Sequence, residues 1–195
     1  MIVTSGMLVE QYSSYANPNN KIARMVASGE LTPIRRGLYE TDGKTPGYRL
    51  ASSVYGPSYL SFEYALSRHG LIPEAVVVYT SATCGKRRSK RYETPFGAFV
   101  YHDVPTNTFP LWIDLVREGE YRYWMASPEK AICDQLYRMP PVANIDELEQ
   151  LLFQNLRIDE QSFFSLRPQA FTQVANACRC RNIEKLAAYV RRVLR

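Results

Sequence analysis

The sequence predicts an α+β fold built from three consecutive blocks. A basic amphipathic segment and a short hairpin pattern occupy residues 19–40, and strand-like segments gather between about residues 75 and 125. Segments with helical periodicity follow from about residue 127 to residue 194. Because strands and helices come in blocks and do not alternate, the pattern favours α+β over a doubly wound sheet.

Residues 19–28 have the pattern of a helix with one apolar and one basic face. The apolar face comprises Ile22, Ala23, Met25 and Val26. The opposite face comprises Asn20, Lys21, Arg24 and Ser28. Side chains of these types can bond both phosphates and base edges, so this face is a candidate DNA-binding surface.

Turn-forming residues delimit this helix. Asn19 or Asn20 is expected to cap its first turn, and Gly29 is expected to end it in a left-handed conformation. A preceding helix is predicted over Met7–Tyr15, with Leu8, Tyr12 and Tyr15 as its buried stripe. Asn17 and Pro18 are expected to break the chain between the two helices, as in a helix-turn-helix.

A short hairpin is predicted directly after this helix. Leu31–Ile34 forms its first strand, with Pro33 restricting that strand to an edge, and Leu38 and Tyr39 begin the second. Arg35-Arg36-Gly37 supplies the turn, where two arginines can meet a phosphate backbone. Residues 1–45 therefore fit a winged helix-turn-helix. The alternative, a generic helix and hairpin with a solvated basic face, stays open.

The bulk composition restricts the classes of protein. The chain has 195 residues and a formal net charge of +5, which favours an anionic partner. No apolar run is long enough for a membrane span, and the first residues lack the pattern of a secretory signal, so we expect a cytoplasmic protein. The four cysteines lack metal-ligand spacing and are expected to be free thiols.

Charge is distributed unevenly along the chain. Five basic residues crowd into one segment: Lys86, Arg87, Arg88, Lys90 and Arg91. This segment could extend a DNA footprint if it folds beside the hairpin, or it could be a solvated loop. The C-terminal segment from Arg179 to Arg195 is also basic. There we favour solvent-exposed charges over a DNA contact, because cations are stabilised at helix C-termini.

Residues 46–195 are expected to form a second domain after a turn-rich linker, Thr41–Pro46. Helices are predicted over 47–55 and 58–68, and a strand buried on both faces over 75–80. Hairpin strands are expected at 91–94 and 98–103, and a further strand at 121–125. Ser127 and Pro128 should open a helix to about residue 137. Helices are expected at 145–155, 159–165, 168–178 and 182–194, the last opened by Asn182.

A search for catalytic chemistry gives little. His69 precedes Gly70 at a helix end, and His102 lies on a strand beside Asp103, where neighbouring side chains point to opposite faces. No phosphate-binding glycine motif occurs. We therefore expect no catalytic residue, no metal site and no cofactor. The aromatic group Tyr121, Tyr123 and Trp124 could stack on bases, although aromatic residues at strand spacing are more often core.

The chain resembles a known family, the AbiEi antitoxins of bacterial type IV toxin–antitoxin systems. The segments that carry the resemblance are IARMVASGELTPIRRGLYE, YGPSYLSFEYALSRHGLIPE, VVVYTSATCGKRR, ETPFGAFVYHDV and YWMASPEKAICDQLY. Their order and spacing cover roughly residues 20 to 140. One departure is the short N-terminus, so the first helix of a winged domain would be abbreviated or supplied by residues 47–55.

The resemblance implies a fold and a function. It implies an N-terminal winged helix-turn-helix over residues 1–45 and a C-terminal antitoxin domain over residues 46–195. Such a protein binds double-stranded DNA at inverted repeats of its own promoter and represses its operon. It also counteracts a nucleotidyltransferase toxin, without requiring a stable complex. By position, Lys21, Arg24, Arg35 and Arg36 match the recognition helix and wing.

The sequence is also compatible with two other functions. One is a plain winged-helix transcriptional regulator without a toxin. The other is a metal-dependent nuclease, for which Glu93, Asp103 and Asp114 are the candidate acids around the lysine- and arginine-rich segment. The sequence lacks the Gly-Ser and Asp-x-Asp motif expected of the cognate toxin, so the chain is not predicted to be that toxin.

Overall fold

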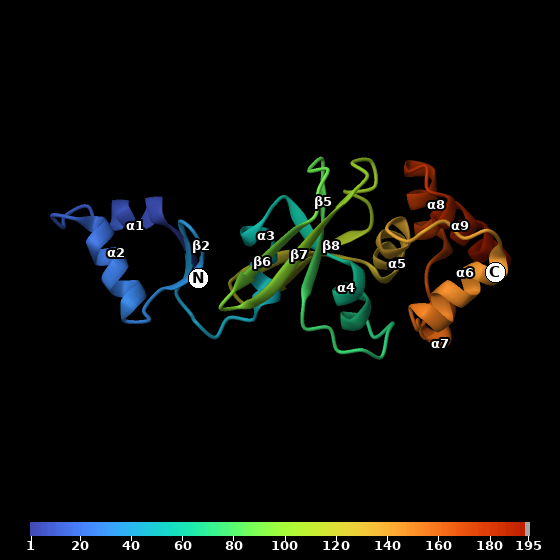
Figure 1. Cartoon of the computed structure of the whole chain (residues 1–195), viewed down its shortest axis with the longest axis horizontal. Coiled ribbons are helices and arrows are strands. Elements are labelled where there is room, and N and C mark those ends of the chain that lie inside the picture. Colours follow the sequence, from blue (N-terminus) through green and yellow to red (C-terminus); the bar gives the residue numbers. More distant parts are fainter. Residues whose placement is uncertain (194–195) are drawn as a thin grey trace.

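The computed structural model describes residues 1–193. It is a mixed α+β fold with N-terminal helices and a small sheet, a central six-stranded sheet and a helical C-terminal part. The three parts follow one another along an elongated molecule (Figure 1). Residues 194 and 195, which include the end of the helix expected over 182–194, lie outside the described residues.

The N-terminal module consists of two helices and a three-stranded sheet. Its elements are β1 (Ile2–Thr4), α1 (Ser5–Gln11), α2 (Pro18–Ala27), β2 (Thr32–Arg35) and β3 (Leu38–Glu40). The strand order is β1-β3-β2, and both pairings are antiparallel. Its small core comprises Val3, Leu8, Ile22, Met25 and Leu31. As expected, β2 with Pro33 is an edge strand, and Gly29 has a positive φ of 80°.

Several local expectations for this module were wrong. Asn17 caps α2 in place of Asn19 or Asn20, because its side chain accepts the Asn20 N–H at 3.1 Å and Pro18 then occupies the first helical position. Tyr15 lies beyond the end of α1 and is exposed, as is Ala23 on α2. Strand β1 was not expected, because a three-residue strand gives no periodic signal.

The central part is a mixed sheet with two short helical elements before it and one helix within it. Its strands are β4 (Ser58–Leu60), β5 (Tyr79–Cys84), β6 (Lys90–Thr94), β7 (Gly97–Val104), β8 (Ile113–Glu118) and β9 (Tyr121–Ala126). The helical elements are η1 (Gly47–Leu50), α3 (Ala51–Val54) and α4 (Phe62–Arg68). The strand order is β6-β7-β5-β4-β9-β8, with parallel pairing between β5 and β7 and between β4 and β9.

The sequence misplaced the start of this sheet. Residues 58–60, expected to begin a helix, form β4, so the strands start well before residue 75. The expected buried strand 75–80 is also wrong, because β5 starts at Tyr79 and Val77 is 81% exposed. An apolar run without alternation does not define which residues pair, and here β4 and β7 fix the register of β5.

The two faces of the central sheet carry different cores. One face packs against η1, α3 and the hairpin β2–β3, through a cluster that includes Ile34, Leu38, Leu50, Phe99 and Tyr101. The other face packs against α4, α5 and the C-terminal helices. Residues 47–55 therefore do not complete the N-terminal core, as the sequence had suggested, but lie against the central sheet beside the hairpin.

The C-terminal part contains α5 (Pro128–Tyr137), α6 (Ile145–Glu149), the π-helical turn η2 (Gln150–Asn155), α7 (Glu160–Phe164), α8 (Pro168–Ala177) and α9 (Arg181–Val193). Ser127 caps α5 as expected. Asn182 does not open α9 but lies within it, buried, and its amide donates to three carbonyls at the end of α5. No helix among residues 1–193 is long and apolar enough to cross a membrane.

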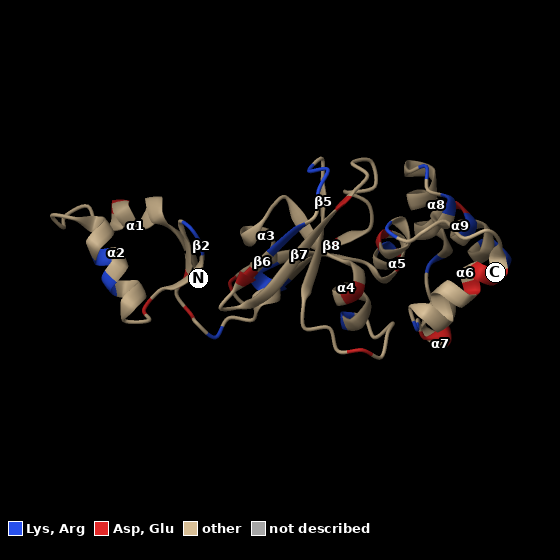
Figure 2. Cartoon of the chain, in the orientation of Figure 1, with Lys and Arg blue, Asp and Glu red and all other residues tan. Residues whose placement is uncertain are grey.

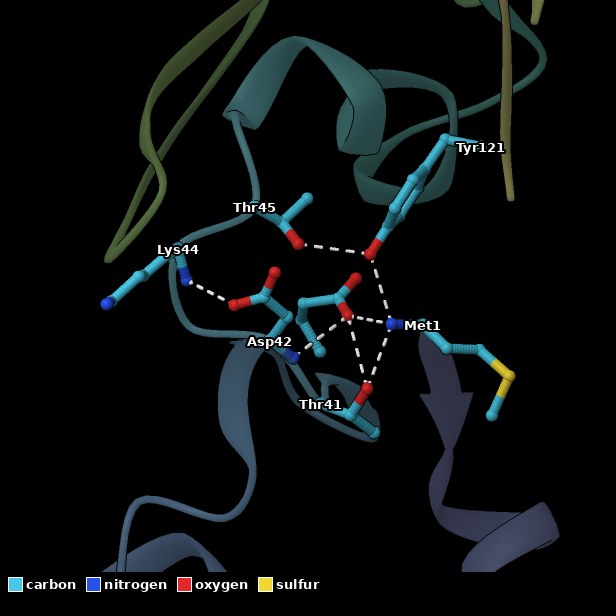
Figure 3. Close-up of polar contacts among 7 residues, drawn as sticks. Met1, Thr41, Asp42, Lys44, Thr45 and Tyr121 are labelled. Carbon is cyan, nitrogen blue, oxygen red and sulfur yellow. Dashed lines mark hydrogen bonds and ion pairs between the residues drawn. The ribbon is translucent and has the colours of Figure 1, made fainter. Parts of the chain in front are cut away.

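Polar contacts join the N-terminal module to the central sheet (Figure 3). The amino group of Met1 forms an ion pair with the buried carboxylate of Glu40 and donates to the Tyr121 hydroxyl at 3.0 Å. The hydroxyls of Tyr121 and Thr45 are also 3.0 Å apart. These contacts and the shared core around Ile34 hold the hairpin β2–β3 against the central sheet.

Candidate nucleic-acid interface

Helix α2 presents most of its expected polar face to solvent. Asn20, Arg24 and Ser28 are exposed, and Lys21 is half-buried. The Lys21 ammonium lies over the ring of Tyr12, 5.9 Å from its centroid, which restrains this side chain toward α1. The Ser28 hydroxyl donates to the Met25 carbonyl at 3.2 Å, so part of its bonding capacity is already used. Asn20 and Arg24 are therefore the freest polar groups of this face.

The turn between β2 and β3 carries the two expected arginines. Arg35 is the last residue of β2, and Arg36 and Gly37 form the turn, with a φ of 77° at Gly37. The Gly37 carbonyl accepts the backbone N–H of Ser5 at 3.0 Å, which fixes the turn against the start of α1. Both arginines are exposed, and neither forms an ion pair within residues 1–193.

The basic segment 86–91, which we name the loop 86–91, is a loop only as far as Ser89, because Lys90 and Arg91 already begin β6. One carboxylate holds its first residues. Asp103 on β7 accepts the backbone N–H groups of Lys86 at 3.1 Å and Arg87 at 2.8 Å. It also accepts the Thr83 hydroxyl at 3.2 Å. Arg87 has a left-handed φ of 53°, and the hydrogen bond to Asp103 holds the loop in that conformation. The side chains of Arg87 and Arg88 are exposed as a result.

Aromatic side chains next to this loop belong to the same core cluster as the apolar residues of the hairpin. Strand β2 contacts β6, whose first residue Lys90 pairs with Tyr101 of β7. Burial raises the pKa of Tyr101, and the nearby positive charge of Arg35 opposes that rise. The Tyr101 ring lies 5.3 Å from the Tyr55 ring, which in turn lies 5.4 Å from the Lys86 ammonium. The Lys86 ammonium thus lies over Tyr55, which packs on Tyr101 at the sheet face that the hairpin covers.

Three basic segments therefore lie on the N-terminal and central parts of the molecule: α2, the turn 35–37 and the loop 86–91 (Figure 2). The sequence identified their basic residues but missed Asp103 and Tyr55 as groups that contact the loop. Both contacts join residues distant in the sequence, so no local pattern indicates them.

The aromatic group 121–124 does not form one stacking surface. Tyr121 and Tyr123 point to the face of the sheet covered by the hairpin, where Tyr123 is buried. Trp124 points to the opposite face and is 43% exposed. Alternation along β9 therefore separates Trp124 from the two tyrosines, because successive strand residues point to opposite faces.

Both histidines form contacts that connect elements of the fold. Burial, and after it the nearby charge of Arg138, lowers the pKa of His102 to about 4, so the ring is neutral near pH 7. Its Nδ1 lies 2.9 Å from the Ser89 hydroxyl. The His69 Nε2 atom lies 2.8 Å from the Ala126 carbonyl, which ties the end of α4 to β9. Among the residues that the structure describes, neither ring has a carboxylate hydrogen-bond partner of the kind that orients a general base.

The three candidate nuclease acids are dispersed. Glu93 lies on β6 and Asp114 on β8, which are opposite edges of the central sheet. Asp103 is occupied with the loop 86–91. Within residues 1–193, no three His, Cys, Asp or Glu side chains gather so that they could hold a metal ion.

No protein-family model matches this chain, and a search of curated proteins finds no similar sequence.

Proposed function

We propose that this chain is a DNA-binding antitoxin that represses its own toxin–antitoxin operon and counteracts a nucleotidyltransferase toxin. The observation that carries the DNA-binding half is the arrangement of the N-terminal module. Two consecutive helices, of which the second exposes a basic face, are followed by a hairpin with two arginines at its turn that form no ion pair within residues 1–193. This order supports a winged helix-turn-helix with α2 as the recognition helix and β2–β3 as the wing.

The proposed interface divides into two kinds of contact. Asn20, Lys21, Arg24 and Ser28 on α2 would enter a groove of the duplex, where Arg and Asn can read base edges. Arg35 and Arg36 would bind phosphates beside that groove. The contact between β2 and β6, the strand that follows the basic loop, supports extending the footprint to Lys86, Arg87 and Arg88.

The antitoxin half of the proposal rests on the resemblance to the AbiEi family. The partner DNA would be the protein's own promoter with its inverted repeats, and the toxin would be a nucleotidyltransferase encoded next door. A stable complex with the toxin is not required. The protein would act in the cytoplasm without a cofactor, and residues 46–195 would carry the neutralising activity.

A plain winged-helix regulator is the second candidate, because the same N-terminal observation supports it equally. The adjacent reading frame distinguishes the two, since a toxin gene would encode Gly-Ser followed by Asp-x-Asp. Co-expression with that toxin is the direct test. Rescue of growth by this chain supports the antitoxin, and continued growth arrest alongside normal promoter binding leaves only the regulator.

Fluorescence anisotropy tests the DNA-binding half directly. The purified protein is titrated into its own upstream duplex and into a scrambled duplex at several salt concentrations. Specific binding with a steep salt dependence is expected, because each neutralised phosphate releases counterions. Arg24→Ala should reduce the difference between the two duplexes if Arg24 reads a base. Equal and weak binding to both duplexes would contradict the proposal.

A further inference from the structure

The edge strand β8 and its neighbour β9 carry two arginines directly opposite each other. Arg117 pairs with Arg122 in the antiparallel register. Like charges at directly opposite positions destabilise a strand pair, and both side chains are exposed. Neither arginine forms an ion pair or a side-chain hydrogen bond within the described part of the chain, and the adjacent Glu118 is bonded to Arg49 on the other face. Both guanidinium groups are therefore available to bind an anionic partner.

The next position on the same face is apolar and uncovered. Leu115 pairs with Trp124, and these residues are 38% and 43% exposed. One step further, the Ile113 and Ala126 pair is covered by the main core. The uncovered end of this face is thus a block of four side chains, Leu115, Arg117, Arg122 and Trp124, which we name the β8–β9 patch. Tryptophan and arginine are the residue types that dominate protein interfaces.

The same chain carries a surface complementary to this patch. A hollow of about 400 Å³ near α6, η2 and α7 is lined by Asp146, Glu149, Gln150, Phe153, Gln154 and Glu160. Phe164, which is 43% exposed, lies with its ring 6.2 Å from that of Phe153. Acidic residues gather on α6 and α7, at the opposite end of the molecule from α2 (Figure 2). The hollow thus combines carboxylates with aromatic surface, which matches arginines beside a tryptophan.

We propose that the β8–β9 patch of one copy docks into the acidic hollow of a second copy. Trp124 would enter the hollow beside Phe153, and Arg117 and Arg122 would face Asp146 and Glu160. A second copy is favoured over nucleic acid because half of the patch is apolar and because the acidic, aromatic hollow fits it in both charge and character. The two surfaces differ, so the contact is head-to-tail and does not close on itself as a two-fold dimer would. This inference does not depend on the proposed DNA-binding function.

Two complementary variants test the proposal by analytical ultracentrifugation of the full chain without DNA. The patch variant combines Arg122→Ala with Trp124→Ala, and the hollow variant combines Asp146→Ala with Glu160→Ala. The wild-type protein is expected to associate beyond dimers as its concentration rises, and less so at high salt. Each variant alone should associate at least about tenfold more weakly, the loss expected for interface anchors. All four positions are exposed, and circular dichroism checks that the fold is retained.

Mixing the two variants gives the decisive result. The patch variant retains a working hollow and the hollow variant retains a working patch, so their mixture should form a one-to-one pair that grows no further. A matched control, Tyr137→Ala with Arg179→Ala, removes an exposed aromatic and an exposed arginine elsewhere and should associate like the wild type. A wild-type protein that stays monomeric would overturn the proposal. So would a patch variant that self-associates normally but binds DNA more weakly.

Discussion

The N-terminal module and the rest of the molecule use charged side chains in opposite ways. In the module, Arg24, Arg35 and Arg36 are exposed and make no ion pair with any described residue. In the body, Lys130 and Asp134 form an ion pair that is almost fully buried. Glu129 is equally buried and is bonded to Arg167.

This difference separates charges that are free for a ligand from charges that stabilise the fold. A buried charge is costly unless every partner is in place, so it specifies one arrangement of the elements around it. Asp134 does this by accepting the hydroxyls of Tyr59 at 2.9 Å and Ser61 at 2.7 Å, which joins α5 to the region of β4. An exposed, unpaired arginine leaves its guanidinium free for an anionic ligand. Variants of the two groups should therefore affect different properties.

The largest effect is expected from Arg167→Met. The Arg167 side chain donates to both carboxylate oxygens of Glu129, at 2.9 Å and 3.1 Å. Its loss leaves a buried carboxylate with too few partners, which should lower the free energy of unfolding by about 3 kcal/mol, at the lower end for a buried ion pair because the Arg167 side chain is 55% exposed. Urea denaturation measures this change, and DNA affinity at a temperature where the variant is folded should stay constant.

Arg157→Met is the matched control for that variant. Arg157 pairs with Glu74, and both side chains are largely exposed, so the expected loss is at most about 1 kcal/mol. Equal losses in the two variants would show that burial does not distinguish the two ion pairs, and the comparison would fail.

Acid should weaken the body through the same carboxylate. Burial alone would raise the pKa of Glu129, but the hydrogen bonds from Arg167 outweigh it and lower the pKa from 4.5 to about 2. Because the folded pKa lies below the unfolded one, the stabilisation is complete above about pH 4.5 and is lost as pH falls toward 2. The shift corresponds to about 3 kcal/mol. In Glu129→Gln, stability measured by denaturant titration should fall less steeply over this pH range.

The turn of the hairpin gives the next largest effect, and on a different property. Arg35→Ala with Arg36→Ala should weaken DNA binding at least about tenfold and reduce the salt slope by about 2, one unit for each phosphate contact. The free energy of unfolding should change by less than about 0.5 kcal/mol, as for other exposed positions. Anisotropy titrations and urea denaturation measure the two quantities.

The matched control for the turn removes two arginines at the other end of the molecule. Arg191→Ala with Arg192→Ala changes the net charge equally, at exposed positions of α9. This variant should keep the affinity and slope of the wild type. A loss equal to that of the turn variant would mean that only total charge matters, and the N-terminal module would lose its special role.

The sequence predicted elements with local signals and missed those defined by distant partners. Helix α5 was predicted correctly because Ser127 and Pro128 specify its first turn. Gly29 and Gly37 likewise marked the end of α2 and the hairpin turn. Strand β1 was missed because its signal lies in its pairing with β3. The start of β5 was misplaced for the same reason. Its pairing with β4 and β7 determines which residues of the apolar run belong to the strand.

The same distinction between local signals and distant partners applies to the candidate interface. The charged residues of α2, the turn and the loop 86–91 are visible in the sequence as clusters of Lys and Arg. The groups that contact the loop are not visible in this way, because Asp103 bonds Arg87 across 16 residues and the Lys86 ammonium lies over Tyr55 only in the folded chain. Composition therefore indicates which residues can bind an anion, and packing decides whether they face the same ligand.

The smallest effect is expected from Asp103→Asn, which tests whether packing presents the loop to DNA. The amide has the shape of the carboxylate but only one acceptor oxygen, so it cannot bond the N–H groups of Lys86 and Arg87 through separate oxygens as Asp103 does. The loop should become more mobile, and DNA affinity should fall about threefold, because ordering the loop then costs extra entropy on binding. Glu93→Gln is the control, since the Glu93 carboxylate forms an ion pair with the exposed Arg91 side chain and does not bond the loop's backbone N–H groups among the hydrogen bonds of residues 1–193. If Asp103→Asn binds DNA as tightly as Glu93→Gln, the loop 86–91 lies outside the interface and the binding charges are confined to the N-terminal module.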